Sequence, residues 1–162
     1  MEHLFAGWRA QFVTGGERAS GCVFCTIGAE SGEDDRHYVV ARGEASFVVL
    51  NLYPYTSGHL MVVPRAHIGD LAGLSGPLVE EMLGLVRSAH DALQAAYQPE
   101  GVNIGMNLGR AAGAGIVEHV HIHLVPRWSG DANFMSTLAE TRVLPETLSD
   151  TMAKLRAHWP PG

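Results

Sequence analysis

The stretch His119-Val120-His121-Ile122-His123-Leu124-Val125-Pro126-Arg127-Trp128 decides the fold, because three histidines alternate in it with aliphatic residues. Successive side chains of a β-strand point to opposite faces, so the three imidazoles share one face and the aliphatic residues share the other. The simple alternative is a half-buried strand whose polar side happens to carry histidine. Three imidazoles in register instead favour a site that uses them near neutral pH, as nucleophile, proton carrier or metal ligand.

The rest of the chain predicts strands grouped around one long helix. Short apolar runs predict strands at residues 37–42, 46–51, 59–64, 102–108 and 118–126. Apolar residues three and four apart predict an amphipathic helix over 77–97, with Ser75 as its N-terminal cap, and a final helix is expected within 145–158. The glycine-rich, acidic stretch 28–35 is expected to be a loop. This grouping favours an α+β fold with an antiparallel sheet.

Composition limits the organisation and the partners of the chain. Its 162 residues, 46% of them hydrophobic, suit a single domain over residues 21–162 that follows an N-terminal arm over residues 1–20. No apolar run approaches the roughly 20 residues of a membrane span, and residues 1–10 lack the features of a signal peptide. We therefore expect a cytoplasmic protein with no membrane partner.

The net charge of −6 argues against nucleic acid as a partner, because nucleic-acid binding needs a basic face. A small phosphate-bearing molecule is still compatible with this charge. Backbone N–H groups and one or two arginines, such as Arg110 and Arg127, would meet its anionic groups.

The histidine run resembles the histidine triad (HIT) superfamily of nucleotide hydrolases and transferases, which carries the pattern His-x-His-x-His-x-x with x apolar. The resemblance covers roughly residues 21–135, and residues 125–135 are similar to the branch that includes bacterial diadenosine tetraphosphate phosphorylases. It implies a five-stranded antiparallel sheet with a long helix, commonly paired into a homodimer. We expect a homodimer or tetramer.

The resemblance also implies the roles of the histidines. His121, at the middle position, is the predicted nucleophile that attacks the α-phosphorus of a nucleotide. Its other ring nitrogen is expected to donate to a backbone carbonyl, which fixes the tautomer. His123 is expected to contact phosphate and to deliver a proton to the leaving group, and His59 is expected to support the site.

The loop at residues 110–117 is expected to contact phosphate. Its small residues, Gly113 and Gly115 among them, and the backbone of Ile116 let N–H groups approach an anion; a merely flexible turn is the alternative. Many hydrolases of the superfamily have Gly-Gln-Ser-Val or Gly-Gln-Thr-Val here, where this chain has residues 114–117 as Ala-Gly-Ile-Val. Backbone donors and the amide of Asn107 would substitute, and this departure favours the phosphorylase branch.

Two further residues are predicted to contact the nucleotide. Asn51 ends a predicted strand at the position where related proteins bind the ribose hydroxyls, although asparagine there is also an ordinary turn residue. Trp128 is a candidate to stack on a base or close the pocket, although a tryptophan is more often part of a core.

The resemblance also implies a structural zinc site. Several superfamily members pair a Cys-x-x-Cys motif with the histidine of a Pro-basic-x-His segment and the first triad histidine, and this chain supplies Cys22, Cys25, His67 and His119. Two thiolates and two imidazoles form a closed tetrahedral Zn²⁺ set. A redox-active cysteine pair is the alternative, but the sequence predicts neither the strand-to-helix setting nor the polar surroundings of a reactive thiol.

Three functions follow from this reading, and a zinc-dependent scaffold with no nucleotide role is the least favoured alternative, because a metal site explains His119 but leaves His121 and His123 unused. The leading one is an enzyme that splits diadenosine tetraphosphate with inorganic phosphate into ATP and ADP. The second is a hydrolase of dinucleoside polyphosphates or nucleoside phosphoramidates. The third, which is not enzymatic, is a nucleotide-binding regulator.

Overall fold

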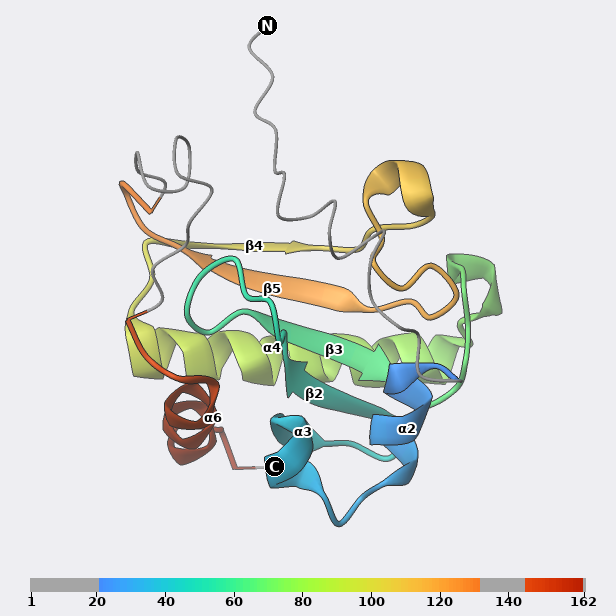
Figure 1. Ribbon diagram of the computed structural model, residues 1–162, viewed down its shortest axis with the longest axis horizontal. Helices are drawn as coiled ribbons and strands as arrows, with labels where there is room; N and C mark the ends of the chain where they lie inside the picture. The colour runs from blue at the N-terminus through green and yellow to red at the C-terminus, as the bar shows by residue number, and fades with distance from the viewer. Residues whose placement is uncertain (1–20, 132–144, 162) are drawn as a thin grey trace, which may run out of the picture.

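The computed structural model describes residues 21–131 and 145–161, and within them five strands form one antiparallel sheet (Figure 1). The strand order is β1-β2-β3-β5-β4, and every neighbouring pair is antiparallel. The strands are β1 (Val39–Arg42), β2 (Ser46–Leu50), β3 (Leu60–Pro64), β4 (Gly101–Gly105) and β5 (Ile122–Arg127). The predicted α+β class and five-stranded antiparallel sheet are confirmed.

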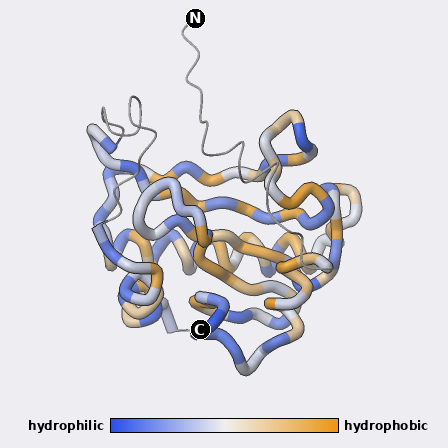
Figure 2. Tube along the Cα trace, in the orientation of Figure 1, coloured by the Kyte–Doolittle hydropathy of each residue, from blue (hydrophilic) through white to orange (hydrophobic). Residues whose placement is uncertain are grey.

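One face of the sheet packs on the long helix α4 (Gly76–Tyr97), which lies behind the sheet in Figure 1. Leu60, Ile122 and Leu124 from the sheet meet Met82 and Leu93 of the helix in a buried cluster. The predicted helix at 77–97 is therefore confirmed, although Ser75 makes no side-chain hydrogen bond at its start. The final helix, α6 (Leu148–Ala157), packs against α4 and β1. Figure 2 shows the hydrophobic residues concentrated along the central strands.

The other face of the sheet carries two short helices, α2 (Val23–Ala29) and α3 (Asp34–His37), in front of the sheet in Figure 1. Phe24 and Ile27 of α2 pack with Phe47, Val49 and other buried strand residues. The predicted loop at 28–35 was thus wrong at both of its ends. Helix α2 continues to residue 29 and α3 begins at residue 34, because tertiary packing stabilises these short segments.

The strand that carries the histidines is shorter than predicted. Strand β5 begins at Ile122, so His119 and His121 lie in an extended segment just before it. The Val120 N–H donates to the Ile68 carbonyl (2.7 Å), outside the ladder that joins β5 to β3. The alternation of faces nevertheless holds. Ile122 packs against α4 on one face of the sheet, whereas the rings of His119 and His121 contact the Phe24 ring of α2 on the opposite face.

Two short 3-10 turns complete the described chain, η1 (Leu71–Gly73) and η2 (Arg110–Ala112). Strand β4 ends at Gly105, three residues earlier than predicted. Among the described residues no helix is long and apolar enough to cross a membrane. The predicted arm at 1–20 and residues 132–135 of the phosphorylase-like segment lie outside the described residues.

Candidate active site and metal centre

A cavity of about 370 Å³ opens on the face of the sheet that carries α2 and α3. It collects residues from both short helices, from β2 and β3, from the loops that follow β2 and β4, and from the histidine segment that leads into β5. Seven of the predicted site residues line it: Asn51, Asn107, Gly113, Gly115, Ile116, His121 and His123. Segments more than 60 residues apart in the chain therefore meet around one space of a size that suits a small-molecule ligand.

His121 is held in one tautomer by the backbone. Its Nδ1–H donates to the carbonyl oxygen of His119 (2.9 Å), and the side chain is buried against the Phe24 ring, with centroids 5.1 Å apart. Burial lowers the pKa of His121 by more than the hydrogen bond to the carbonyl raises it. A neutral imidazole with its proton on Nδ1 keeps an unprotonated Nε2, which is what a nucleophile requires.

Two more imidazoles, those of His59 and His123, lie beside His121. The ring centroids of His121 and His123 are 4.7 Å apart. The Tyr55 N–H donates to Nδ1 of His59 (3.2 Å), so the neutral His59 ring carries its proton on Nε2. That nitrogen lies 3.0 Å from Nδ1 of His123 and donates to it. Nδ1 of His123 is then an acceptor, so the proton of its neutral ring is on Nε2.

His59 thus lies behind His123 and contacts its ring nitrogen. It is 1% exposed and does not line the cavity, although the sequence predicted it among the catalytic residues. Gly58, which precedes it, has a φ of +82° and packs so closely that a Cβ there would lie 2.9 Å from Leu93 Cδ2. The positive φ favours glycine at this turn, and a Cβ would also require the Leu93 methyl to shift.

The predicted phosphate loop turns tightly next to the histidines. Gly109 and Gly113 flank η2 with φ values of +80° and +85°, a conformation that favours glycine. Asn107 and Gly115 line the cavity from either side of this turn. Neither Arg110 nor Arg127 lines it, so the two arginines expected to meet phosphate are elsewhere.

Arg127 and Trp128 lie at the far end of β5 from the histidines. The Arg127 guanidinium is bound by Asp131 and by Asn103 Oδ1 (2.9 Å), and the Trp128 N–H donates to Asp131 (3.3 Å). Neither side chain reaches the cavity of this chain. The structure therefore does not bring Trp128 together with the other predicted nucleotide-binding residues.

Asn51 lines the cavity just after β2, and its side chain also closes a local turn. Its Oδ1 accepts a hydrogen bond from the Tyr53 N–H (2.9 Å). The amide nitrogen of such a side chain is a donor and can bind a hydroxyl. The turn reading and the cavity reading are thus compatible.

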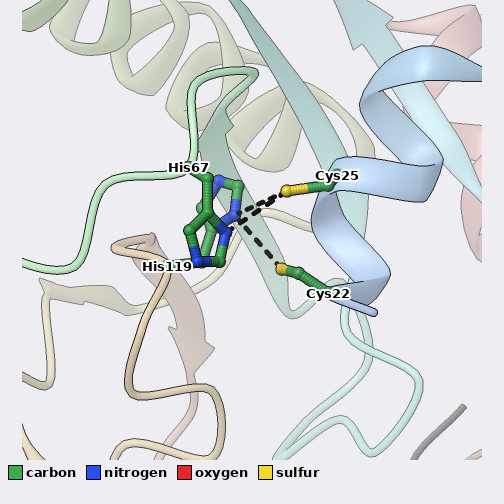
Figure 3. A group of neighbouring side chains, drawn as sticks. All are labelled: Cys22, Cys25, His67 and His119. Atoms are coloured by element: carbon green, nitrogen blue, oxygen red, sulfur yellow. Dashed lines mark hydrogen bonds between the residues drawn. The ribbon is translucent and has the colours of Figure 1, made fainter. Parts of the chain in front are cut away.

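The four predicted metal ligands form one cluster between α2 and the start of the histidine segment (Figure 3). Their ligand atoms all lie within 4.8 Å of one another. Cys22 Sγ lies 3.3 Å from His119 Nδ1, and Cys25 Sγ lies 3.3 Å from His67 Nδ1 and 3.7 Å from His119 Nδ1. Tetrahedral coordination at the usual zinc–sulfur and zinc–nitrogen lengths requires S···N separations of about 3.5 Å. The cluster could therefore hold a metal ion.

His119 is oriented for this cluster by its other nitrogen. Its Nε2–H donates to the carbonyl of Pro64 (2.8 Å), which directs the lone pair of Nδ1 toward the cysteines. The same residue accepts from His121 through its carbonyl. One residue thus joins the metal cluster to the predicted nucleophile.

The sequence missed the cavity residues that come from α2 and α3. Val23, Phe24 and Ile27 form an apolar wall, and Arg36 and His37 line it from α3. The spacing of Phe24 and Ile27, three residues apart, was the available signal for a helix face. Helix α2 also begins at the cysteine pair, a setting that the sequence did not predict. Burial, followed by the neighbouring Cys22, raises the pKa of Cys25, which does not favour a reactive thiolate.

Comparison with known proteins agrees with this geometry. The family model described as "HIT domain" matches residues 32–130. The AP-4-A phosphorylase of Mycobacterium tuberculosis is 42% identical over 126 residues, which are 78% of this chain and 65% of that protein, so the chain spans less than two thirds of that relative's length. An uncharacterized HIT-like protein of Saccharolobus solfataricus is 34% identical over 114 residues, 70% of this chain and 79% of that protein.

A solved structure supports the same assignment. A Zn-bound histidine triad family protein from Mycobacterium smegmatis superposes with a TM-score of 0.68 at 28% identity, over 85% of this chain and 92% of that one. With its histidine segment, its antiparallel sheet and these matches, the chain belongs to the HIT family.

Proposed function

We propose that this chain is a nucleotidyltransferase that splits diadenosine tetraphosphate with inorganic phosphate, giving ATP and ADP. The observation that carries the proposal is the bond from His121 Nδ1–H to the His119 carbonyl, at the wall of a cavity large enough for a nucleotide. It leaves a neutral Nε2 as the nucleophilic atom. The similarity to a protein named AP-4-A phosphorylase supports the choice of substrate.

The reaction has two displacements at the same phosphorus. In the first, Nε2 of His121 forms a bond to the α-phosphorus of one adenosine, and the bond from that phosphorus to the bridging oxygen breaks, which releases ATP. In the second, an oxygen of inorganic phosphate attacks the adenylyl-histidine, the phosphorus–nitrogen bond breaks, and ADP leaves. One difficult displacement is thereby divided into two easier ones.

His123 would donate the proton on its Nε2 to the departing oxygen of ATP. The hydrogen bond from His59 supports this role, because it makes Nδ1 of His123 an acceptor. Backbone groups around Gly113, Gly115 and Ile116, with Asn107, would stabilise the charge on the phosphorus centre. Asn51 would bind the ribose hydroxyls.

We further propose that Zn²⁺ occupies the cluster of Cys22, Cys25, His67 and His119. Two thiolates and two imidazoles suit zinc in a structural site, and the neighbour from Mycobacterium smegmatis is described as Zn-bound. When bound, the ion would tie α2 to the histidine segment and take no part in bond breaking.

A homodimer, or a tetramer built from it, is proposed through the β4 edge of the sheet. Among the described strands β4 pairs with β5 alone, at the edge of the sheet, and Ile104 on it is 50% exposed. An unpaired edge with an exposed apolar residue is a typical site of pairing between chains. Size-exclusion chromatography with light scattering, compared between wild type and Ile104→Lys, tests this assembly.

The acceptor is tested by the products. Diadenosine tetraphosphate is incubated with and without inorganic phosphate, and the nucleotides are separated by chromatography. Phosphorolysis gives equal ATP and ADP and requires phosphate, whereas ATP and AMP in phosphate-free buffer would identify a hydrolase. A nucleotide-binding regulator would bind the substrate and form neither product set, and it would contradict the proposal.

A further inference from the structure

Helix α3 contributes two polar side chains to the cavity that have no part in the proposed histidine chemistry. Arg36 and His37 both line the cavity. Arg36 is the only lysine or arginine on the described part of the cavity wall. Much of the wall around them is apolar, including Val23, Ile27 and Leu52. A guanidinium there has the chemistry to bind an electron-rich ring or a hydrogen-bond acceptor.

The carboxylates around Arg36 are bound to other partners. Asp34 pairs with Arg42 (2.7 Å) and Asp35 pairs with Arg156 (2.5 Å). Within the described chain, Arg36 itself has no ion pair within 4.0 Å. Among the described residues, its guanidinium is thus not held by a carboxylate.

His37 is committed on one nitrogen only. Its Nε2 lies 2.6 Å from Glu30 Oε2, and because a carboxylate only accepts, this nitrogen carries the proton. Nδ1 of the neutral ring is then an acceptor. Both residues line the cavity, so Arg36 can offer a donor there and His37 an acceptor.

The register of the sheet places this pair near the ribose end of the cavity. Val39 pairs with Val49, and the Leu50 N–H donates to the Tyr38 carbonyl (3.0 Å), so the last residues of α3 lie beside Asn51. In the proposed function the phosphates lie at a different part of the cavity wall, around His121. A base attached to a ribose at Asn51 extends away from the phosphates.

We propose that Arg36 and His37 bind the hydrogen-bonding edge of the nucleotide base and give the cavity a preference for adenine. This inference rests on the proposed function, and names the part of the substrate that α3 recognises. Arg36 donates to a ring nitrogen of the purine, and Nδ1 of His37 accepts from the exocyclic amino group of adenine. Guanine has a carbonyl oxygen in place of that amino group. Two acceptors, this oxygen and Nδ1 of His37, would then face each other and could not form a hydrogen bond.

The test uses binding, so that it does not depend on turnover. The full chain is titrated by calorimetry with AMP and GMP, and ribose 5-phosphate is measured by competition against AMP. The variants are Arg36→Ala, His37→Phe and the matched control Arg87→Ala, whose residue is exposed on α4, on the opposite face of the sheet. Thermal unfolding checks that each variant folds.

Wild type is expected to bind AMP more tightly than GMP. Arg36→Ala is expected to weaken AMP roughly tenfold while changing ribose 5-phosphate less than about twofold, because a charged donor to the base is lost. His37→Phe is expected to reduce the AMP-to-GMP preference, and Arg87→Ala to behave as wild type.

Several results would overturn the inference. An equal loss for AMP and ribose 5-phosphate in Arg36→Ala would mean that Arg36 attracts phosphate, and no loss beyond the Arg87→Ala control would mean that it does not contact ligand. An unchanged preference in His37→Phe would remove His37 from base recognition. Wild type that binds nucleotides without an adenine preference contradicts this inference alone, whereas wild type that binds neither nucleotide contradicts the proposed function as well.

Discussion

Removal of the proposed zinc ion is expected to destabilise the fold strongly, because the four-residue cluster links segments far apart in the chain. Cys22 and His119 are 97 residues apart in sequence and their ligand atoms are 3.3 Å apart. A covalent link closing a loop of that length restricts the unfolded chain by about 4–5 kcal/mol. By the same reasoning, loss of zinc would lower the melting temperature by roughly 10 °C or more in a chain of this size.

The assay is thermal unfolding followed by circular dichroism, before and after treatment with a zinc chelator. Zinc content per chain is measured by atomic emission. His67→Ala removes one ligand and should melt low with no further response to chelator, whereas the control His90→Ala, on α4 and away from the cluster, should respond as wild type does. Adding Zn²⁺ back should restore the wild-type melting temperature, and Mg²⁺ should not.

The reasoning would be refuted by a protein that melts at the same temperature with and without chelator. It would also be refuted if His67→Ala and His90→Ala were indistinguishable in melting temperature and in zinc content. Either result would mean that the cluster closes no loop in the folded protein.

Three further predictions concern residues that hold the site in place. His59→Ala should lower kcat with little change in KM, because the hydrogen-bond partner of His123 Nδ1 is lost, and His59→Phe should be equally slow. Pre-steady-state release of ATP measures the rate of the first displacement, and an unchanged rate in His59→Ala would contradict this prediction. Gly58→Ala should lower the free energy of unfolding by about 1–3 kcal/mol in urea titrations, since its Cβ would lie 2.9 Å from Leu93 Cδ2 at a φ of +82°, and a loss below 0.5 kcal/mol would argue against this. Burial raises the pKa of Glu146, but the hydrogen bonds from Lys154, Tyr97 and Thr151 together lower it by more, and the pKa falls below its ordinary value. The contribution of Glu146 to stability is therefore present above about pH 4.5 and is lost as the pH falls below it. Glu146→Gln should be less stable than wild type at pH 7 by about 1–3 kcal/mol, with a gap that narrows toward pH 3, and a gap independent of pH would count against it.

The sheet and the long helix could be predicted because their patterns are local. The alternation of histidines with aliphatic residues, and the apolar spacing over 77–97, identify faces from the sequence alone. The four metal ligands also meet as the family resemblance implied. The sheet and the long helix follow from periodicity in the sequence, and the cluster follows from short motifs that match the family pattern.

The short helices could not be predicted because partners distant in sequence hold them. Gly28 has a low helix propensity, which argues against a helix at this point of the sequence. Helix α2 is nevertheless stabilised there, because two arginines distant in sequence donate hydrogen bonds to the carbonyls at its end. Arg65 Nη1 donates to the Gly28 carbonyl (2.6 Å), and Arg42 Nη2 donates to the Ile27 carbonyl (3.0 Å). The end of the cavity that α2 and α3 build was therefore missing from the sequence-based site.

Trp128 shows the converse limit, because a residue near the histidines in sequence lies far from them in space. A strand rises about 3.3 Å per residue, so five positions along β5 separate Trp128 from His123 by about 16 Å. Proximity in sequence along an extended strand is thus a weak indication of a shared site.

The most direct test of the proposed function is to trap the intermediate on His121. Diadenosine tetraphosphate labelled at the α-phosphorus is mixed with the protein in the absence of inorganic phosphate, the reaction is quenched within milliseconds to seconds, and the peptides are examined by mass spectrometry. We predict one adenylate on His121, none in His121→Ala, and its conversion to ADP when phosphate is added before the quench. Absence of label during turnover, or label on another residue that persists in His121→Ala, would contradict the account.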